Sequence, residues 1–142
     1  MPRLDAYLFF DGNCAEAMRF YESALGGKID TMMTHGQSPM ADQAPPGSAD
    51  RIMHAHLSLP GGGVLMASDD MPGGFKGMQG FKLSLHYDTV DEGKRIFDAL
   101  ADGGHVVLPF DKTFWADGFG MLTDRFGTPW MVNVAAAQPP QS

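Results

Sequence analysis

The sequence predicts an α+β fold in which one unit, a strand followed by a helix and three strands (βαβββ), occurs twice. A chain of 142 residues, 44% of them hydrophobic, is long enough for a packed core but short for two independent domains. The two halves also match in sequence. An alignment of one half on the other matches Arg19-Phe20-Tyr21-Glu22 with Arg95-Ile96-Phe97-Asp98, and the same alignment matches Ala6 with Lys82. Two small sheets that each bury one face against a helix make an α+β domain.

The first half begins with an apolar run, Leu4 to Phe10, which predicts a strand that stops at Asp11-Gly12-Asn13. Asn13 is placed to cap a helix from Cys14 to Leu25, in which apolar residues recur at helical spacing. Gly26-Gly27 then predicts the end of this helix.

The rest of the first half alternates between loops and strands. Residues 34–50 are rich in turn-forming residues and predict a surface loop. Ile52 to Leu59 and Val64 to Ser68 predict a hairpin joined by three glycines, and Asp69 to Gly80 predicts a connector between the halves.

The second half repeats this order. Phe81 to Tyr87 predicts a strand, and Val90 to Ala101 predicts a helix capped by Asp88 or Thr89. Three further strands are expected at Val106-Val107-Leu108, Met121-Leu122-Thr123 and Trp130 to Val134. We therefore expect one domain over residues 1–142, with a first module at about 3–70, a second at about 80–135 and a tail at 136–142.

Charge and composition disfavour several classes of partner. The net charge of −7 disfavours binding to the phosphate backbone of a nucleic acid. The sequence has neither a basic amphipathic segment nor a long apolar stretch, so a membrane partner is not expected. Cys14 is the single cysteine, so no intrachain disulfide is expected. The N-terminus does not have the pattern of a signal peptide, and the expected location is the cytoplasm.

Three stretches resemble one protein family. Tyr7 to Ala17 with the following Phe20-Tyr21 and Leu25-Gly26-Gly27 is similar to the opening of the PhnB-like branch of the vicinal oxygen chelate superfamily. His54-Ala55-His56-Leu57 with Gly63 to Asp69 resembles the middle hairpin of that branch, and Trp115 to Gly120 with Asp124 to Gly127 resembles its C-terminal signature. This superfamily includes glyoxalase I, bleomycin-resistance proteins and extradiol dioxygenases.

The resemblance implies a glyoxalase/bleomycin-resistance-like fold, in which two βαβββ modules form a cupped mixed sheet, in a homodimer. Some members of the branch carry the label of demethylubiquinone methyltransferase. The sequence has no glycine-rich strand-to-helix turn that would hold S-adenosylmethionine, so this label receives little weight.

The resemblance also implies a divalent metal held by His and Glu side chains. Carried onto this chain, the four ligand positions fall on Ala6, Met66, Lys82 and Met131. A methyl group, two thioethers and an ammonium do not suit a hard or borderline divalent ion, so we expect neither a metal nor another cofactor.

His54, His56 and Lys82 are the candidate catalytic residues. Strand alternation places both histidines on the face opposite Ala55 and Leu57, and therefore toward the cavity. One of them would act as acid or base near neutral pH, whereas the competing interpretation is that they bond loop backbone or pack in a dimer interface. A third interpretation is a substitute metal site made of His54, His56 and His86.

A second set of residues is expected to line a ligand-binding pocket. These are small, thioether, polar or aromatic side chains on the strands and in the C-terminal signature: Ala6, Leu8, Met66, Ser68, Ser84, His86, Trp115, Phe119 and Met131. Trp130 is predicted to be core instead. Cys14 lies at a helix start, where a thiol can be activated, but a buried structural role is favoured over a nucleophilic one.

These features favour a small-molecule-binding protein that lacks the usual divalent metal site. A second hypothesis is a metal-independent enzyme that acts on a small oxygenated substrate through His54, His56 and Lys82. The sequence is also compatible with a metal-dependent lyase or dioxygenase-like enzyme with non-standard ligands, and with a regulatory or scaffolding dimer without a ligand. The fold alone does not decide between these functions.

Overall fold

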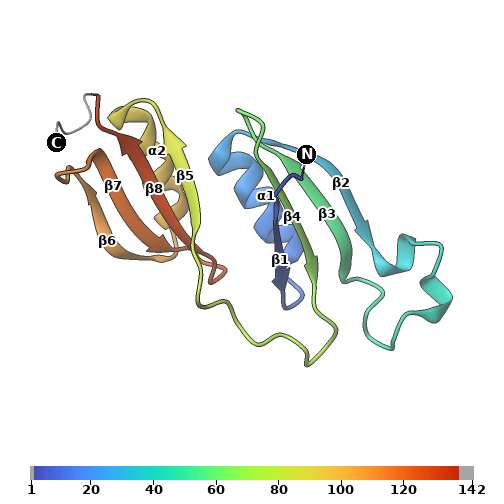
Figure 1. The fold of residues 1–142 in the computed structure, drawn as a ribbon. Coiled ribbons are helices and arrows are strands. Elements are labelled where there is room, and N and C mark those ends of the chain that lie inside the picture. The colour runs from blue at the N-terminus through green and yellow to red at the C-terminus, as the bar shows by residue number, and fades with distance from the viewer. Residues whose placement is uncertain (1, 138–142) are drawn as a thin grey trace. The chain divides into compact units, whose positions relative to one another are not determined.

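The computed structural model describes residues 2–137. The chain forms two compact units, Met1–Gly77 and Met78–Ser142, which we call unit 1 and unit 2. Each unit contains a four-stranded mixed sheet with one α-helix packed against it (Figure 1). The predicted α+β fold with two βαβββ units is therefore confirmed.

In unit 1 the strand order is β1-β4-β3-β2, and in unit 2 it is β5-β8-β7-β6. The first and last strands of each unit pair in parallel, and the other neighbours pair antiparallel. The elements of unit 1 are β1 (Ala6–Phe10), α1 (Cys14–Leu25), β2 (Lys28–Thr34), β3 (Ile52–Ser58) and β4 (Val64–Asp69). Those of unit 2 are β5 (Leu83–Tyr87), α2 (Val90–Ala101), β6 (His105–Asp111), β7 (Ala116–Thr123) and β8 (Pro129–Ala135).

Both helices begin and end where the sequence predicts. In α1 the buried face includes Ala17, Met18 and Tyr21, and Gly26 ends the helix with a left-handed φ of 74°. In α2 the Thr89 side chain accepts a hydrogen bond from the N–H of Glu92 and caps the helix. The predicted loop at 34–50 contains two short 3₁₀ helices, His35–Gln37 and Ala41–Gln43, and β6 and β7 are longer than predicted.

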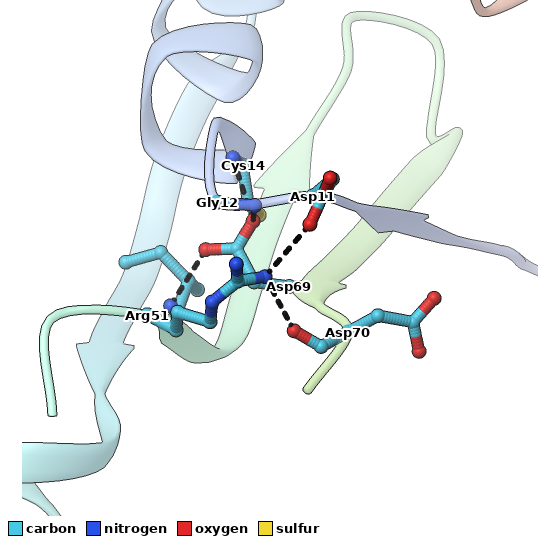
Figure 2. A network of polar contacts seen from close by, with 7 residues as sticks. Asp11, Gly12, Cys14, Arg51, Asp69 and Asp70 are labelled. Atoms are coloured by element: carbon cyan, nitrogen blue, oxygen red, sulfur yellow. Dashed lines mark hydrogen bonds and ion pairs between the residues drawn. The ribbon is translucent and has the colours of Figure 1, made fainter. Parts of the chain in front are cut away.

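The start of α1 is held by a carboxylate from β4 and not by the expected cap (Figure 2). The Asn13 side chain makes no capping hydrogen bond. Instead, Asp69 Oδ1 accepts the N–H groups of Gly12 (2.9 Å) and Cys14 (3.0 Å), and Asp69 Oδ2 accepts that of Ile52 (2.8 Å). Asp69 is 4% exposed, so this buried carboxylate ties the β1–α1 turn to β3 and β4.

Unit 2 has a comparable buried carboxylate at its β7–β8 turn. Asp124 Oδ1 accepts the N–H groups of Phe126 and Thr128, and Asp124 Oδ2 accepts Nε1–H of Trp130 at 2.8 Å. Trp130 is 2% exposed, so its predicted place in the core is confirmed. Among the described residues, no helix has the length and apolar character required to span a membrane.

The strand register corrects one detail of the predicted repeat. The helices match as expected, Cys14 with Val90, but Tyr7 pairs with Met66 in unit 1 where Ser84 pairs with Met131 in unit 2. The reason is that three residues separate β1 from α1, whereas only Asp88 and Thr89 separate β5 from α2. A shift of one residue turns a strand's side chains to the opposite face, so the superposition of Ala6 on Lys82 is wrong.

Candidate functional site

The face of each sheet opposite its helix, which we call the open face, carries most of the predicted site residues. In unit 1 the register places Tyr7, Met66 and His56 side by side on β1, β4 and β3. Phe9, Ser68 and His54 follow two residues further along the same strands. Leu8 and Ala55 point the other way and are buried, which shows that they lie on the helix side.

Ala6 and Leu8 therefore do not face the open side, contrary to the expectation from the sequence. Leu8 is 4% exposed and Ala6 shares its face, because alternate residues of a strand point in the same direction. Tyr7 and Phe9 take their places on the open face, and their rings lie 5.3 Å apart. The strand β1 lies within the predicted range, but the side chains predicted to face the cavity lie on the helix side of the sheet.

Tyr7 and His54 form the first polar contact on this face. Tyr7 Oη lies 3.0 Å from His54 Nδ1, and the two ring centroids are 5.7 Å apart. Since β4 separates β1 from β3, the Tyr7 side chain must extend across β4 to reach this nitrogen. A phenol can donate or accept, so this bond is compatible with either tautomer of His54.

Asp30, His56 and Ser58 form the second polar cluster. Asp30 Oδ2 lies 3.1 Å from His56 Nδ1 and also accepts a hydrogen bond from Ser58 Oγ. The Ser58 hydrogen bond lowers the pKa of Asp30 below its ordinary value, and the hydrogen bond and charge of His56 lower it further. An ionised carboxylate only accepts hydrogen bonds, so Nδ1 of His56 is the nitrogen that carries the proton.

Tyr7 and Asp30 are not among the site residues predicted from the sequence. Asp30 lies at an irregularity of the β2–β3 register between Ile29 and Thr31. Aspartate is disfavoured within strands, so its position amid Ile29, Thr31 and Met32 was an available signal of a bulge. Tyr7 takes the predicted position of Ala6 when the alignment of β1 with β5 is shifted by one residue.

The open face of unit 2 is built around His86. Asn133 Nδ2 donates to His86 Nδ1 at 3.4 Å, and His86 Nε2 lies 3.1 Å from Ser84 Oγ. Met131 lies beside Ser84 in the register, and Phe119 lies beside Asn133. His86 is thus held from both ring nitrogens by neighbours on the sheet.

Aromatic residues lie beside this face. The Trp115 ring is 5.5 Å from that of Phe119 in an edge-to-face arrangement, and 4.8 Å from that of Phe114. Trp115 is 46% exposed. Lys82 and Met131, with Gly80 and Phe81, line a shallow depression of about 480 Å³.

The structure thus brings His54, His56, Met66 and Ser68 together in unit 1, and Ser84, His86, Phe119 and Met131 together in unit 2 (their placement follows from the pairings above). Trp115 is close to Phe119, and Lys82 lies directly before β5. Whether these residues bind a ligand or catalyse a reaction stays a prediction.

Cys14 has the properties of a structural residue. It is fully buried, and burial together with the charge of Asp69 raises the pKa of its thiol to about 12. A thiol with this pKa is almost entirely protonated at neutral pH and is a poor nucleophile.

The donors at the superfamily's metal positions do not fit a divalent metal. Carried over from the resemblance with the corrected register, these positions fall on Tyr7 with its strand neighbour Met66, and on Ser84 with its strand neighbour Met131. Thioether, phenol and hydroxyl groups are poor ligands for such ions. The same holds for the four residues expected from the sequence at these positions. Among residues 2–137, no group of three or more His, Cys, Asp or Glu side chains is arranged to hold a metal ion.

Two βαβββ units, each with one open sheet face, define an architectural class of duplicated-module proteins. The chain belongs to the Glyoxalase/Bleomycin resistance protein/Dioxygenase superfamily, whose family model matches residues 3–132. This confirms the resemblance seen in the sequence.

The chain is also similar to three individual proteins. It is 41% identical to protein YjdN of Escherichia coli K12, over 99% of this chain and 100% of that protein. It is 44% identical to protein PA1353 from Pseudomonas aeruginosa, whose crystal structure matches with a TM-score of 0.87 over 95% of this chain and 98% of that one. The PhnB protein from Bacillus cereus, named a putative 3-demethylubiquinone-9 3-methyltransferase, is 26% identical with a TM-score of 0.77, over 94% of this chain and 100% of that one.

Proposed function

We propose that this protein binds a small organic molecule on the open sheet faces and does so without a resident divalent metal. The observation that carries the proposal is the composition of the open face of unit 1. There, exposed Tyr7 and Phe9 rings lie beside the hydrogen-bonding side chains of His54 and His56.

This combination suits an amphipathic ligand. Tyr7 and Phe9 are 41% and 47% exposed, an unusual position for two adjacent aromatic rings in a sheet strand. Binding an aromatic or otherwise apolar group would remove this surface from water, which favours association by roughly 25 cal/mol per Å² of apolar area. The histidines would supply the few polar contacts that orient such a ligand.

A methyltransferase role is not part of the proposal. S-adenosylmethionine would need a glycine-rich strand-to-helix turn whose backbone it can approach closely, and the β1–α1 turn, Asp11-Gly12-Asn13, has a single glycine. In that turn Asp69 accepts the N–H groups of Gly12 and Cys14.

The proposal is tested with purified protein and a panel of aromatic and non-aromatic small molecules. Thermal-shift measurement identifies stabilising compounds, and titration calorimetry confirms their affinity. We expect stabilisation by aromatic members, and weakening of that effect in the double variant Tyr7→Ser/Phe9→Ser. The control is Met40→Ser, which removes an exposed apolar side chain of the loop between β2 and β3. A well-folded protein that none of the compounds stabilises contradicts the proposal.

The absence of a resident metal has its own test. Elemental analysis of protein purified without chelator should find no divalent ion in stoichiometric amount. One tightly held ion per chain would restore the metal-dependent hypothesis. Light scattering of the same sample tests the homodimer that the family resemblance implies.

A metal-independent enzyme is the second candidate, and the two polar clusters of unit 1 favour it. Tyr7–His54 and Asp30–His56 each join an imidazole to a group that can orient it, as in general acid–base catalysis. If a compound from the panel is converted, His54→Ala is expected to abolish its turnover while the protein still folds and binds it. Full turnover by His54→Ala would show that His54 is not catalytic.

A further inference from the structure

We infer that Asp30 is a positioning residue that makes His56 Nε2 a hydrogen-bond acceptor, and that the ligand is a hydroxylated aromatic compound whose hydroxyl donates to this nitrogen. The inference rests on the proposed function, because it takes the open face of unit 1 as the binding surface. It adds the chemical class of the ligand and the role of Asp30.

The first step is to determine which nitrogen of the His56 ring carries the proton. Asp30 Oδ2 lies 3.1 Å from Nδ1 of His56 and accepts the Ser58 hydroxyl as well. A carboxylate oxygen that accepts two hydrogen bonds leaves Nδ1 as the protonated nitrogen. In the neutral imidazole the lone pair then lies on Nε2, as in carboxylate–histidine pairs at metal and catalytic sites.

The second step is that Nε2 is available. Within the described residues, the hydrogen bonds of His56 involve Nδ1 and not Nε2. The His56 side chain is 28% exposed, so part of the imidazole is open to solvent on this face. His54 differs, because its bond to the Tyr7 phenol is compatible with either tautomer.

The third step is the distance from this acceptor to the aromatic residues. Tyr7, Met66 and His56 are register neighbours on three consecutive strands. Strands lie about 4.8 Å apart, so the backbones of Tyr7 and His56 are separated by roughly 10 Å. The Tyr7 side chain itself extends across β4 toward β3. A compound of one or two rings that stacks on Tyr7 can therefore bring a hydroxyl at its edge to His56.

The surface between these ends is also suitable. Met66 lies between Tyr7 and His56, and a thioether makes favourable contacts with aromatic rings. Phe9 extends the aromatic surface, with its ring 5.3 Å from that of Tyr7. A planar apolar body therefore meets Tyr7, Phe9 and Met66 while its hydroxyl meets His56.

The experiment compares two probes that differ in one hydrogen-bond donor. 2-Naphthol donates from its hydroxyl, whereas 2-methoxynaphthalene has the same rings and no donor. Titration calorimetry with the full chain should show that 2-naphthol binds roughly tenfold more tightly, the effect of one good hydrogen bond.

The variants test the role of Asp30. In Asp30→Asn the amide can donate to Nδ1, which moves the ring proton of His56 to Nε2 and should reduce the affinity ratio to about one. His56→Phe removes the acceptor and should have the same effect on the ratio, while still binding both probes. The control Asp42→Asn changes the same charge at an exposed position in the loop and should keep the tenfold preference.

A spectroscopic readout separates positioning from a merely structural role. Long-range ¹H–¹⁵N spectra report which ring nitrogen of a histidine is protonated. Wild-type His56 should show a protonated Nδ1, and Asp30→Asn should show a protonated Nε2. Circular dichroism confirms that each variant is folded.

Three results overturn the inference. Equal affinity of the wild type for both probes excludes the acceptor role but leaves aromatic binding, and thus the proposed function, intact. An unchanged tautomer and ratio in folded Asp30→Asn show that Asp30 does not position His56. Binding of neither probe excludes the ligand class, while the wider compound panel decides the proposed function separately.

Discussion

Replacement of Asp69 by alanine is predicted to destabilise unit 1 strongly. Asp69 accepts three backbone N–H groups, and two of them, those of Cys14 and Ile52, belong to buried hydrogen bonds. A buried donor left without a partner costs roughly 1–3 kcal/mol, so the two buried groups together predict a loss of about 2–6 kcal/mol. The third donor, the N–H of Gly12, belongs to an exposed residue and can form a hydrogen bond with water instead, so it adds little to the loss of stability.

The assay is urea unfolding followed by far-ultraviolet circular dichroism, with amide hydrogen exchange as a local readout. In the variant, the amides of Cys14 and Ile52 should exchange faster than in the wild type. Trp115 and Trp130 both lie in unit 2, so tryptophan fluorescence would report on the wrong unit.

Asp70→Ala is the matched control, because Asp70 accepts from Arg51 through its backbone carbonyl, which alanine retains. If Asp69→Ala and Asp70→Ala differ by less than about 0.5 kcal/mol, the ordinary effect of a surface substitution, the capping argument is refuted.

Three further outcomes are expected. Thiol reagents should not modify Cys14 in the folded protein at pH 8 but should modify it in urea; rapid reaction of the folded form would contradict the assigned burial. Because folding raises the pKa of Cys14 from 9.0 to about 12, the unfolded chain releases this proton first, so the free energy of unfolding should be unaffected below about pH 9 and fall as the pH rises toward 12. Gly120→Ala should cost about 1–3 kcal/mol, because its Cβ would lie 2.7 Å from the Phe97 ring and 2.8 Å from Phe110 Cα, whereas Gly63→Ala, with 3.5 Å to Leu59, should be tolerated; equal melting temperatures would contradict this packing.

The fold could be predicted from the sequence to a large extent. The bounds of both helices, Cys14–Leu25 and Val90–Ala101, agree with the structure because the helical period and the glycines after it are local signals. The core position of Trp130 could be predicted because it alternates with Met131 along one strand, and alternation is again a local property.

The candidate site could be predicted only in part. The prediction that His54 and His56 lie on the open face is correct, because Ala55 and Leu57 identify the buried face of β3. The prediction that Leu8 lines the pocket is wrong. It assumed that the alignment of the two helices extends without a gap to the strands before them, whereas unit 1 has one more residue between strand and helix than unit 2. A single additional residue before α1 reverses every side chain of the preceding strand.

What the sequence by itself determined is the order of elements, the duplication and the superfamily, all of which follow from patterns within short segments or from motifs along the chain. Only the tertiary structure decided that Asp69 caps α1 and that Asp30 holds His56. In each case the partners are distant in the sequence and meet through strand pairing, a relation that hydrophobic periodicity does not encode.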